Sequence, residues 1–92
     1  MSERVRTRVV VGGMVQGVYF RASTQRMAAG LGIDGWVRNL PNGDVEAVFE
    51  GAPELVQQAV AWTSRGPVRA DVQHFERFDE QPEGLAGFRV TS

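Results

Sequence analysis

The 92-residue sequence contains no cysteine. This absence excludes a disulfide framework, a thiolate zinc site and a cysteine nucleophile. The formal net charge is only −1 at pH 7, so the chain has no general attraction for nucleic acid or anionic lipid and any anion site must be local. No apolar run approaches the length of a membrane span or a signal-peptide core, and four of the first eight residues are charged. These features predict a cytoplasmic protein.

The chain has no linker, internal repeat or low-complexity segment. We therefore expect residues 1–92 to form a single domain. A domain of this length buries roughly 60 to 70 % of its unfolded surface, which is enough for one hydrophobic core without disulfide bonds or structural metal ions.

Apolar periodicity and turn signals divide the chain into seven elements. Residues alternate between apolar and polar over 5–11 as in a half-buried strand, and Phe20 begins a stripe at helical spacing that Gly32 is placed to end. Asn42-Gly43 between two alternating segments predicts a hairpin. The expected strands are 5–11, 34–40, 44–50, 68–78 and 87–91, and the expected helices are 20–31 and a segment that starts at Pro53 and ends at Gly66-Pro67.

This element order predicts an α+β protein, a ferredoxin-like βαββαβ sandwich. Right-handed crossovers place both helices on one face of an antiparallel sheet and bring the first and third strands side by side. Arginines and carboxylates then face each other on the helix-free side; they are Arg4, Arg6, Arg8, Asp44, Glu46 and Glu50. We expect these side chains to be exposed, so reversing the charges of Arg6 and Arg8 is predicted to change stability only slightly.

A glycine-rich segment predicts an anion site. Gly12, Gly13 and Gly17 lie between the first strand and the first helix, where glycine lets successive N–H groups point into one concavity beside the positive helix terminus. Arg21 adds a planar charged group suited to two phosphate oxygens. On spacing alone, an ordinary glycine-rich turn without a ligand is equally compatible.

Five motifs resemble those of the acylphosphatase family, and together they cover nearly the whole chain. They are V-Q-G-V-x-F-R at 15–21, G-W-V-R-N at 35–39, N-G-D-V-E at 42–46, G-P-x-x-A-x-V at 66–72 and G-F-R-V at 87–90. The resemblance implies metal-independent and cofactor-independent hydrolysis of an acyl phosphate to a carboxylate and inorganic phosphate. The leaving carboxylate has a conjugate acid with a pKa near ~4, so no general acid is required.

The resemblance also implies a role for each residue of the site. Arg21 binds the phosphoryl group, and Asn39 orients the attacking water. Backbone N–H groups form the phosphate cradle over Val15, Gln16, Gly17, Val18, Tyr19 and Phe20. The implied partners are a small-molecule acyl phosphate and, as site ligands, phosphate or sulfate. We expect a monomer that binds neither nucleic acid nor membrane.

Other residues near these motifs have structural interpretations. We expect the side chain of Gln16 to cap backbone groups, and Phe20 and Trp36 to belong to the core. His74 lies in a strand without clustered metal ligands, which favours a structural or surface role. Arg38 points away from Asn39 by strand alternation and is expected at the surface. Leu40 stands where some family members have a hydroxyl residue.

Two other functions share the predicted architecture. One is a non-catalytic sensor of phosphate or acyl phosphate, or the acylphosphatase-like domain of a larger maturation enzyme, and turnover distinguishes these from an enzyme. The other is an RNA-binding module, which stacks bases on aromatics of the open sheet face. The chain has no R-G-F-G-F-like run, and Glu46 and Glu50 on that face repel phosphates.

Overall fold

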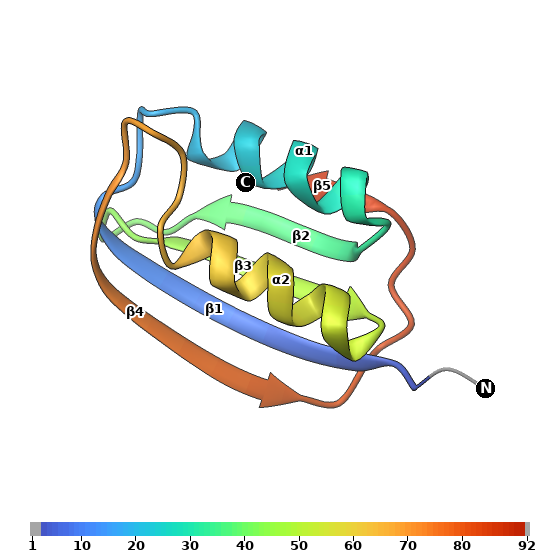
Figure 1. The fold of residues 1–92 in the computed structure, drawn as a ribbon. Helices are drawn as coiled ribbons and strands as arrows, with labels where there is room; N and C mark the ends of the chain where they lie inside the picture. The colour runs from blue at the N-terminus through green and yellow to red at the C-terminus, as the bar shows by residue number, and fades with distance from the viewer. Residues whose placement is uncertain (1–2, 92) are drawn as a thin grey trace.

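Figure 1 shows the fold of the protein in a computed structural model, which describes residues 3–91. Two helices cover one face of a five-stranded sheet. The elements are β1 (Val5–Met14), α1 (Phe20–Leu31), β2 (Asp34–Asn39), β3 (Val45–Gly51), α2 (Pro53–Thr63), β4 (Asp71–Glu80) and β5 (Phe88–Val90). The predicted ferredoxin-like α+β fold is confirmed.

The sheet has the strand order β4-β1-β3-β2-β5. β1 pairs with both β3 and β4 in antiparallel register, as does β2 with β3, so the predicted contact of the first and third strands is present. β5 instead runs parallel to β2, with Gly35 opposite Phe88 and Val37 opposite Val90. This parallel pairing brings the end of the described chain beside the end of β2.

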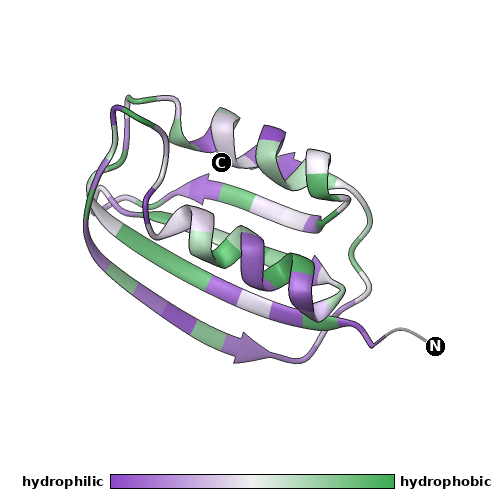
Figure 2. Ribbon diagram, in the orientation of Figure 1, coloured by the Kyte–Doolittle hydropathy of each residue, from purple (hydrophilic) through white to green (hydrophobic). Residues whose placement is uncertain are grey.

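The hydrophobic core lies between the sheet and the two helices. Figure 2 shows that β1 is apolar over its middle, whereas most of the edge strand β4 is hydrophilic. Val9 and Val11 from β1, Phe49 from β3, Phe20 from α1 and Val56 from α2 are all at most 2 % exposed. Val11 directly precedes the predicted anion-site segment and Phe20 begins α1, so the core reaches both ends of this segment.

The prediction that the arginines and carboxylates of the helix-free face are exposed is wrong for its centre. Glu50 is fully buried and Arg6 is 8 % exposed. The segment 81–87 between β4 and β5 covers them, because the N–H groups of Glu83, Gly84 and Leu85 donate to the Glu50 carboxylate at 2.9 to 3.1 Å. Charge reversal at Arg6 is consequently expected to cost far more than the sequence suggested.

Further differences concern a strand boundary and an aromatic side chain. β4 begins at Asp71, not at Val68, because Ala70 N donates to Pro67 O at 2.9 Å and closes a turn there. Trp36 is only half-buried and lies on the helix-free side, with the Arg38 guanidinium 5.3 Å from its ring centre. Strand alternation places Trp36 in phase with Arg38 and not with the buried Val37.

Candidate active site

The segment that leads into α1 has the backbone geometry of an anion-binding loop. Gly17 has φ 75° and Tyr19, the residue before the helix, has φ 61°. In the part of the chain that the structure describes, no side chain caps this helix terminus. Within residues 3–91, Ser23 is the first residue after Met14 whose N–H donates to a backbone carbonyl, that of Tyr19 at 2.9 Å. The preceding N–H groups of α1 are therefore available to an external acceptor, at the positive end of the helix dipole.

The two glycines at the start of the segment have a different role from the one predicted. Gly12 and Gly13 belong to β1, and the pairing with β4 shifts register between them. A Cβ at Gly12 would lie 1.8 Å from the His74 ring, and Gly13 has φ 118°. Between them β4 has one extra residue, Gln73, so the two glycines lie opposite a bulge in β4, and the loop itself begins at Val15.

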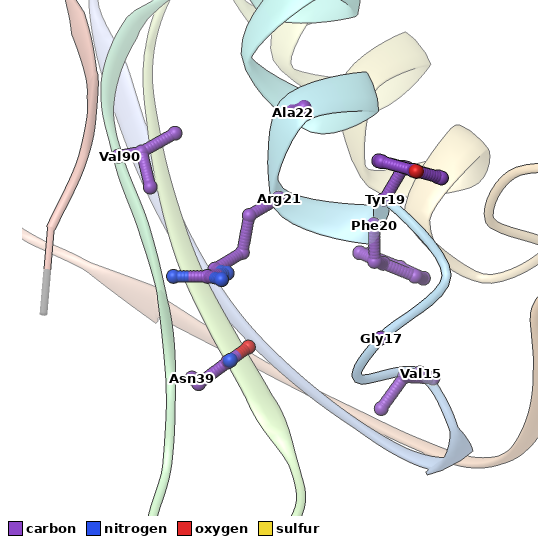
Figure 3. Close-up of a pocket in the computed structure, with 8 residues that line it drawn as sticks. All are labelled: Val15, Gly17, Tyr19, Phe20, Arg21, Ala22, Asn39 and Val90. Carbon is purple, nitrogen blue, oxygen red and sulfur yellow. The ribbon is translucent and has the colours of Figure 1, made fainter.

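A pocket of about 400 Å³ opens at this helix terminus. The residues that line it are Val15, Gly17, Tyr19, Phe20, Arg21, Ala22, Asn39 and Val90. In Figure 3 the guanidinium of Arg21, from α1, and the side-chain amide of Asn39, from the end of β2, extend toward one another across the pocket. The fold thus brings together the two residues that the motifs singled out.

Among residues 3–91, neither the Oδ1 atom of Asn39 nor the Arg21 guanidinium has a protein partner. The Oδ1 atom of Asn39 is buried and has no hydrogen-bond partner, although a buried acceptor normally has one. Arg21 forms no salt bridge with any residue from 3 to 91. No carboxylate lines the pocket among these residues. The pocket consequently has a permanent positive charge and, in its wall, a buried amide oxygen without a hydrogen-bond partner among residues 3–91.

Gln16 links the loop to the β2–β3 hairpin. Its Nε2 atom donates to Leu40 O at 3.0 Å and to Asp44 O at 2.9 Å. The prediction that this side chain caps backbone groups is confirmed. The same contacts hold the loop against the residue that follows Asn39, so the two parts of the site are tied together.

The predicted site residues are not all in the pocket. Val15, Gly17, Tyr19 and Phe20 line it together with Arg21 and Asn39, whereas Gln16 and Val18 do not. Ala22 and Val90 line the pocket without having been predicted. Ala22 directly follows Arg21 in the sequence, so its neighbourhood to the site could have been predicted. Val90 reaches the pocket through the parallel pairing of β5 with β2, which no local pattern indicates.

The remaining candidates lie elsewhere. His74 is 55 % exposed, with Nε2 3.5 Å from the Asp44 carboxylate, in agreement with a surface role. Among residues 3–91 there is no group of three or more His, Cys, Asp or Glu side chains that could hold a metal ion. None of the helices in this part of the chain is both long and apolar enough to span a bilayer.

The fold and the site together define a class, a ferredoxin-like domain with a pocket that contains an arginine at the start of its first helix. The Acylphosphatase family profile matches residues 7–90. A curated acylphosphatase of Gloeobacter violaceus is 53 % identical over 90 residues, which are 98 % of this chain and 97 % of that protein. The chain belongs to the acylphosphatase family.

Solved structures agree with this assignment. An acylphosphatase from Coxiella burnetii superimposes with a TM-score of 0.91 at 36 % identity, over 96 % of this chain and 93 % of that one. The Bacillus subtilis acylphosphatase has a TM-score of 0.91 at 30 % identity, over 96 % of this chain and 99 % of that one.

Proposed function

We propose that this protein hydrolyses acyl phosphates to a carboxylate and inorganic phosphate, and that Arg21 and Asn39 divide the work. The observation that carries the division is the buried, unpartnered Oδ1 atom of Asn39 in the same pocket as Arg21 and the free α1 terminus. A guanidinium and backbone N–H groups bind anions, whereas an amide oxygen accepts a hydrogen from water.

The phosphoryl group binds at the α1 terminus in this proposal. N–H groups of the 15–20 loop and the Arg21 fork donate to its oxygens. Phosphoryl transfer proceeds through a loose transition state with charge spread over these oxygens, so donors that are already aligned stabilise it without reorganisation. The arginine and the helix terminus supply the positive charge, and we propose that no metal ion is needed.

Asn39 positions the attacking water. Its Oδ1 atom accepts a hydrogen from the water, which directs an oxygen lone pair toward phosphorus on the side opposite the leaving carboxylate. The amide is not a base, so it contributes by orientation. The leaving group departs as a carboxylate, whose conjugate acid has a pKa near ~4, and therefore takes no proton from the protein.

Turnover separates this proposal from a sensor of the same fold, which would bind phosphate without releasing product. An RNA-binding role is not favoured, because segment 81–87 covers Glu50 on the helix-free face and Arg6 and Arg8 already pair with carboxylates there. We further propose that the protein acts as a cytoplasmic monomer of one domain. Analytical ultracentrifugation tests the monomeric state, and a dimer at micromolar concentration would contradict it.

Two substitutions test the division of roles. Arg21→Lys keeps a charge but loses the fork, so both the affinity for phosphate and kcat fall. Asn39→Ala leaves phosphate affinity within about twofold while kcat with acetyl phosphate falls about a hundredfold or more, as expected when water positioning is lost. Isothermal titration with phosphate and carboxylate release measure the two quantities.

Arg77→Gln provides the control, because it removes one positive charge from β4, where Arg77 pairs with Asp79. It is expected to change neither quantity by more than about twofold. Equal loss of phosphate affinity in Asn39→Ala and Arg21→Lys would contradict the division of roles. An unmodified protein that binds phosphate but releases no carboxylate would contradict the hydrolase itself.

A further inference from the structure

All ten basic residues of the chain are arginines, and they fall into two sets. One set pairs with carboxylates and consists of Arg4, Arg6, Arg8, Arg38 and Arg77. The other forms no salt bridge with any residue in the described part of the chain and consists of Arg21, Arg26, Arg65, Arg69 and Arg89. Arg21 lines the candidate active site, whereas Arg26 and Arg69 line a different pocket.

Two of these arginines line a second pocket that adjoins the first. This pocket has a volume of about 310 Å³, and its lining includes Tyr19, Arg26 and Arg69. Tyr19 also lines the site that holds Arg21 and Asn39. A ligand bound in the first pocket therefore needs only to pass Tyr19 to reach the second.

The second pocket has a defined construction. Ser23 and Arg26 lie three residues apart and share one face of α1, and Tyr19 directly precedes the helix. Arg69 comes from the opposite wall, in the turn that Ala70 N closes by donating to Pro67 O at 2.9 Å. The two guanidinium groups thus border one hollow from two different segments.

The chemistry of the lining fits an alkyl chain that ends in an anion. No carboxylate lines this pocket among residues 3–91, and guanidinium groups stay charged at any physiological pH. The lining also offers exposed apolar surface, since Tyr19 is 78 % exposed and Val68 is fully exposed. A guanidinium can bind a carboxylate through two parallel N–H···O hydrogen bonds.

We propose that the pocket of Tyr19, Arg26 and Arg69 is a subsite for the far end of the acyl group, and that it selects acyl phosphates whose acyl chain carries a second, terminal carboxylate. The inference rests on the proposed function, because it requires the phosphoryl group to occupy the site of Arg21 and Asn39. The methylene chain lies against the Tyr19 ring and Val68, and the terminal carboxylate pairs with Arg26 and Arg69.

The test compares two substrates with the same six-carbon chain. Hexanoyl phosphate ends in a methyl group and adipoyl monophosphate in a carboxylate, so their ratio of kcat/KM isolates the terminal charge. The ratio is measured for the unmodified protein, for Arg26→Gln/Arg69→Gln, and for Arg77→Gln as the matched loss of charge away from the pocket. Each is assayed at low and high NaCl concentration.

We expect the unmodified protein and Arg77→Gln to prefer adipoyl monophosphate by about three- to tenfold at low salt, and the preference to shrink at high salt. Arg26→Gln/Arg69→Gln loses the preference through a higher KM for adipoyl monophosphate, while its kinetics with hexanoyl phosphate stay within about twofold. No preference in the unmodified protein, or an equal preference in the double variant, overturns the subsite. If neither substrate is hydrolysed by any of the proteins, the proposed function itself has failed.

Discussion

Substitution of Glu50 tests how much the part of the helix-free face that segment 81–87 covers contributes to stability. The carboxylate is fully buried and accepts hydrogen bonds from Arg4 at 3.2 Å, from Arg6 at 2.9 Å and from three N–H groups of the segment 81–87. Burial alone would raise the pKa of Glu50, but the hydrogen bonds from Glu83 N–H, Arg6, Leu85 N–H and Arg4 outweigh it and lower the pKa from 4.5 to about 2. The folded state therefore strongly favours the ionised form.

Glu50→Gln removes this charge while keeping the shape of the side chain. Arg6, whose side chain is 8 % exposed, loses its fully buried partner and keeps the Glu80 carboxylate at 2.9 Å. Removing one member of a buried ion pair costs about 3 to 5 kcal/mol. A domain of this size has a free energy of unfolding of about 5 to 15 kcal/mol, so the loss is a large fraction. At a urea dependence of about 1 kcal/mol per M, the unfolding midpoint should fall by about 3 M.

The unmodified protein offers a second measurement of the same contribution. Because the pKa is lower in the folded state, the stabilisation is complete above pH 4.5 and is lost as pH falls toward about 2. The difference corresponds to about 3 kcal/mol. The pKa of Glu80 is lowered as well, mainly by its hydrogen bonds from Arg8 and Arg6, and adds a loss of the same sign.

Urea unfolding followed by tryptophan fluorescence measures both effects, at pH 7 for the variant and between pH 2 and 6 for the unmodified protein. Glu76→Gln is the control, because Glu76 is exposed on the same face and forms no salt bridge with residues 3–91. A midpoint change below about 0.5 M in Glu50→Gln would refute the reasoning. If the variant does not fold, a flat pH profile of the unmodified protein below pH 4.5 would refute it instead.

Three further predictions concern the backbone and the site. Gly35→Ala should destabilise the protein by about 3 kcal/mol or more, because Gly35 has φ 144° and a Cβ there would lie 1.8 Å from Val48 O. Gly30→Ala should stabilise it by about 0.5 to 1 kcal/mol, because Gly30 is exposed within α1 and a Cβ meets no atom within 4 Å; equal melting temperatures for the two variants would contradict this contrast. Phosphate at a hundredfold excess over Kd should raise the free energy of unfolding by about 2.7 kcal/mol, sulfate should act similarly and chloride much less. Thermal unfolding measures these effects, and a phosphate effect that is unchanged in Arg21→Gln would count against the loop as the anion site. Activity with acetyl phosphate should persist in excess EDTA; loss of activity that one divalent ion restores would contradict the metal-independent mechanism.

The elements that surround the site could be predicted because their signals are local. Alternation predicted which residues of β1 and β3 face the helices, although every residue of β3 is buried. Gly32, with φ 71°, ends α1 where the helical stripe stops. Spacing alone did not place Arg21 beside Asn39. The family motifs and the expected fold together indicated that pairing, since the two residues meet only through the packing of α1 on β2.

The buried state of Glu50 had no local signal. A carboxylate at an outward strand position is normally exposed, and the segment 81–87 that covers it has no periodicity from which its path could be read. The position of Trp36, in contrast, did have a local signal. Its alternation with Val37 indicated the helix-free face, but the prediction followed the tendency of aromatic side chains to be buried. The bulge opposite Gly12 and Gly13 also had no local signal, because its prediction requires the register of β1 with β4.

The choice of arginine for every basic position has a chemical consequence for a protein that handles mixed anhydrides. Acyl phosphates transfer their acyl group to uncharged amines, and a lysine beside the site would present such an amine to each incoming substrate. Arg21, Arg26 and Arg69 supply the same positive charge through guanidinium groups that do not deprotonate in proteins. With no lysine anywhere in the sequence, the side chains that we propose to bind the substrate are ones that it cannot acylate.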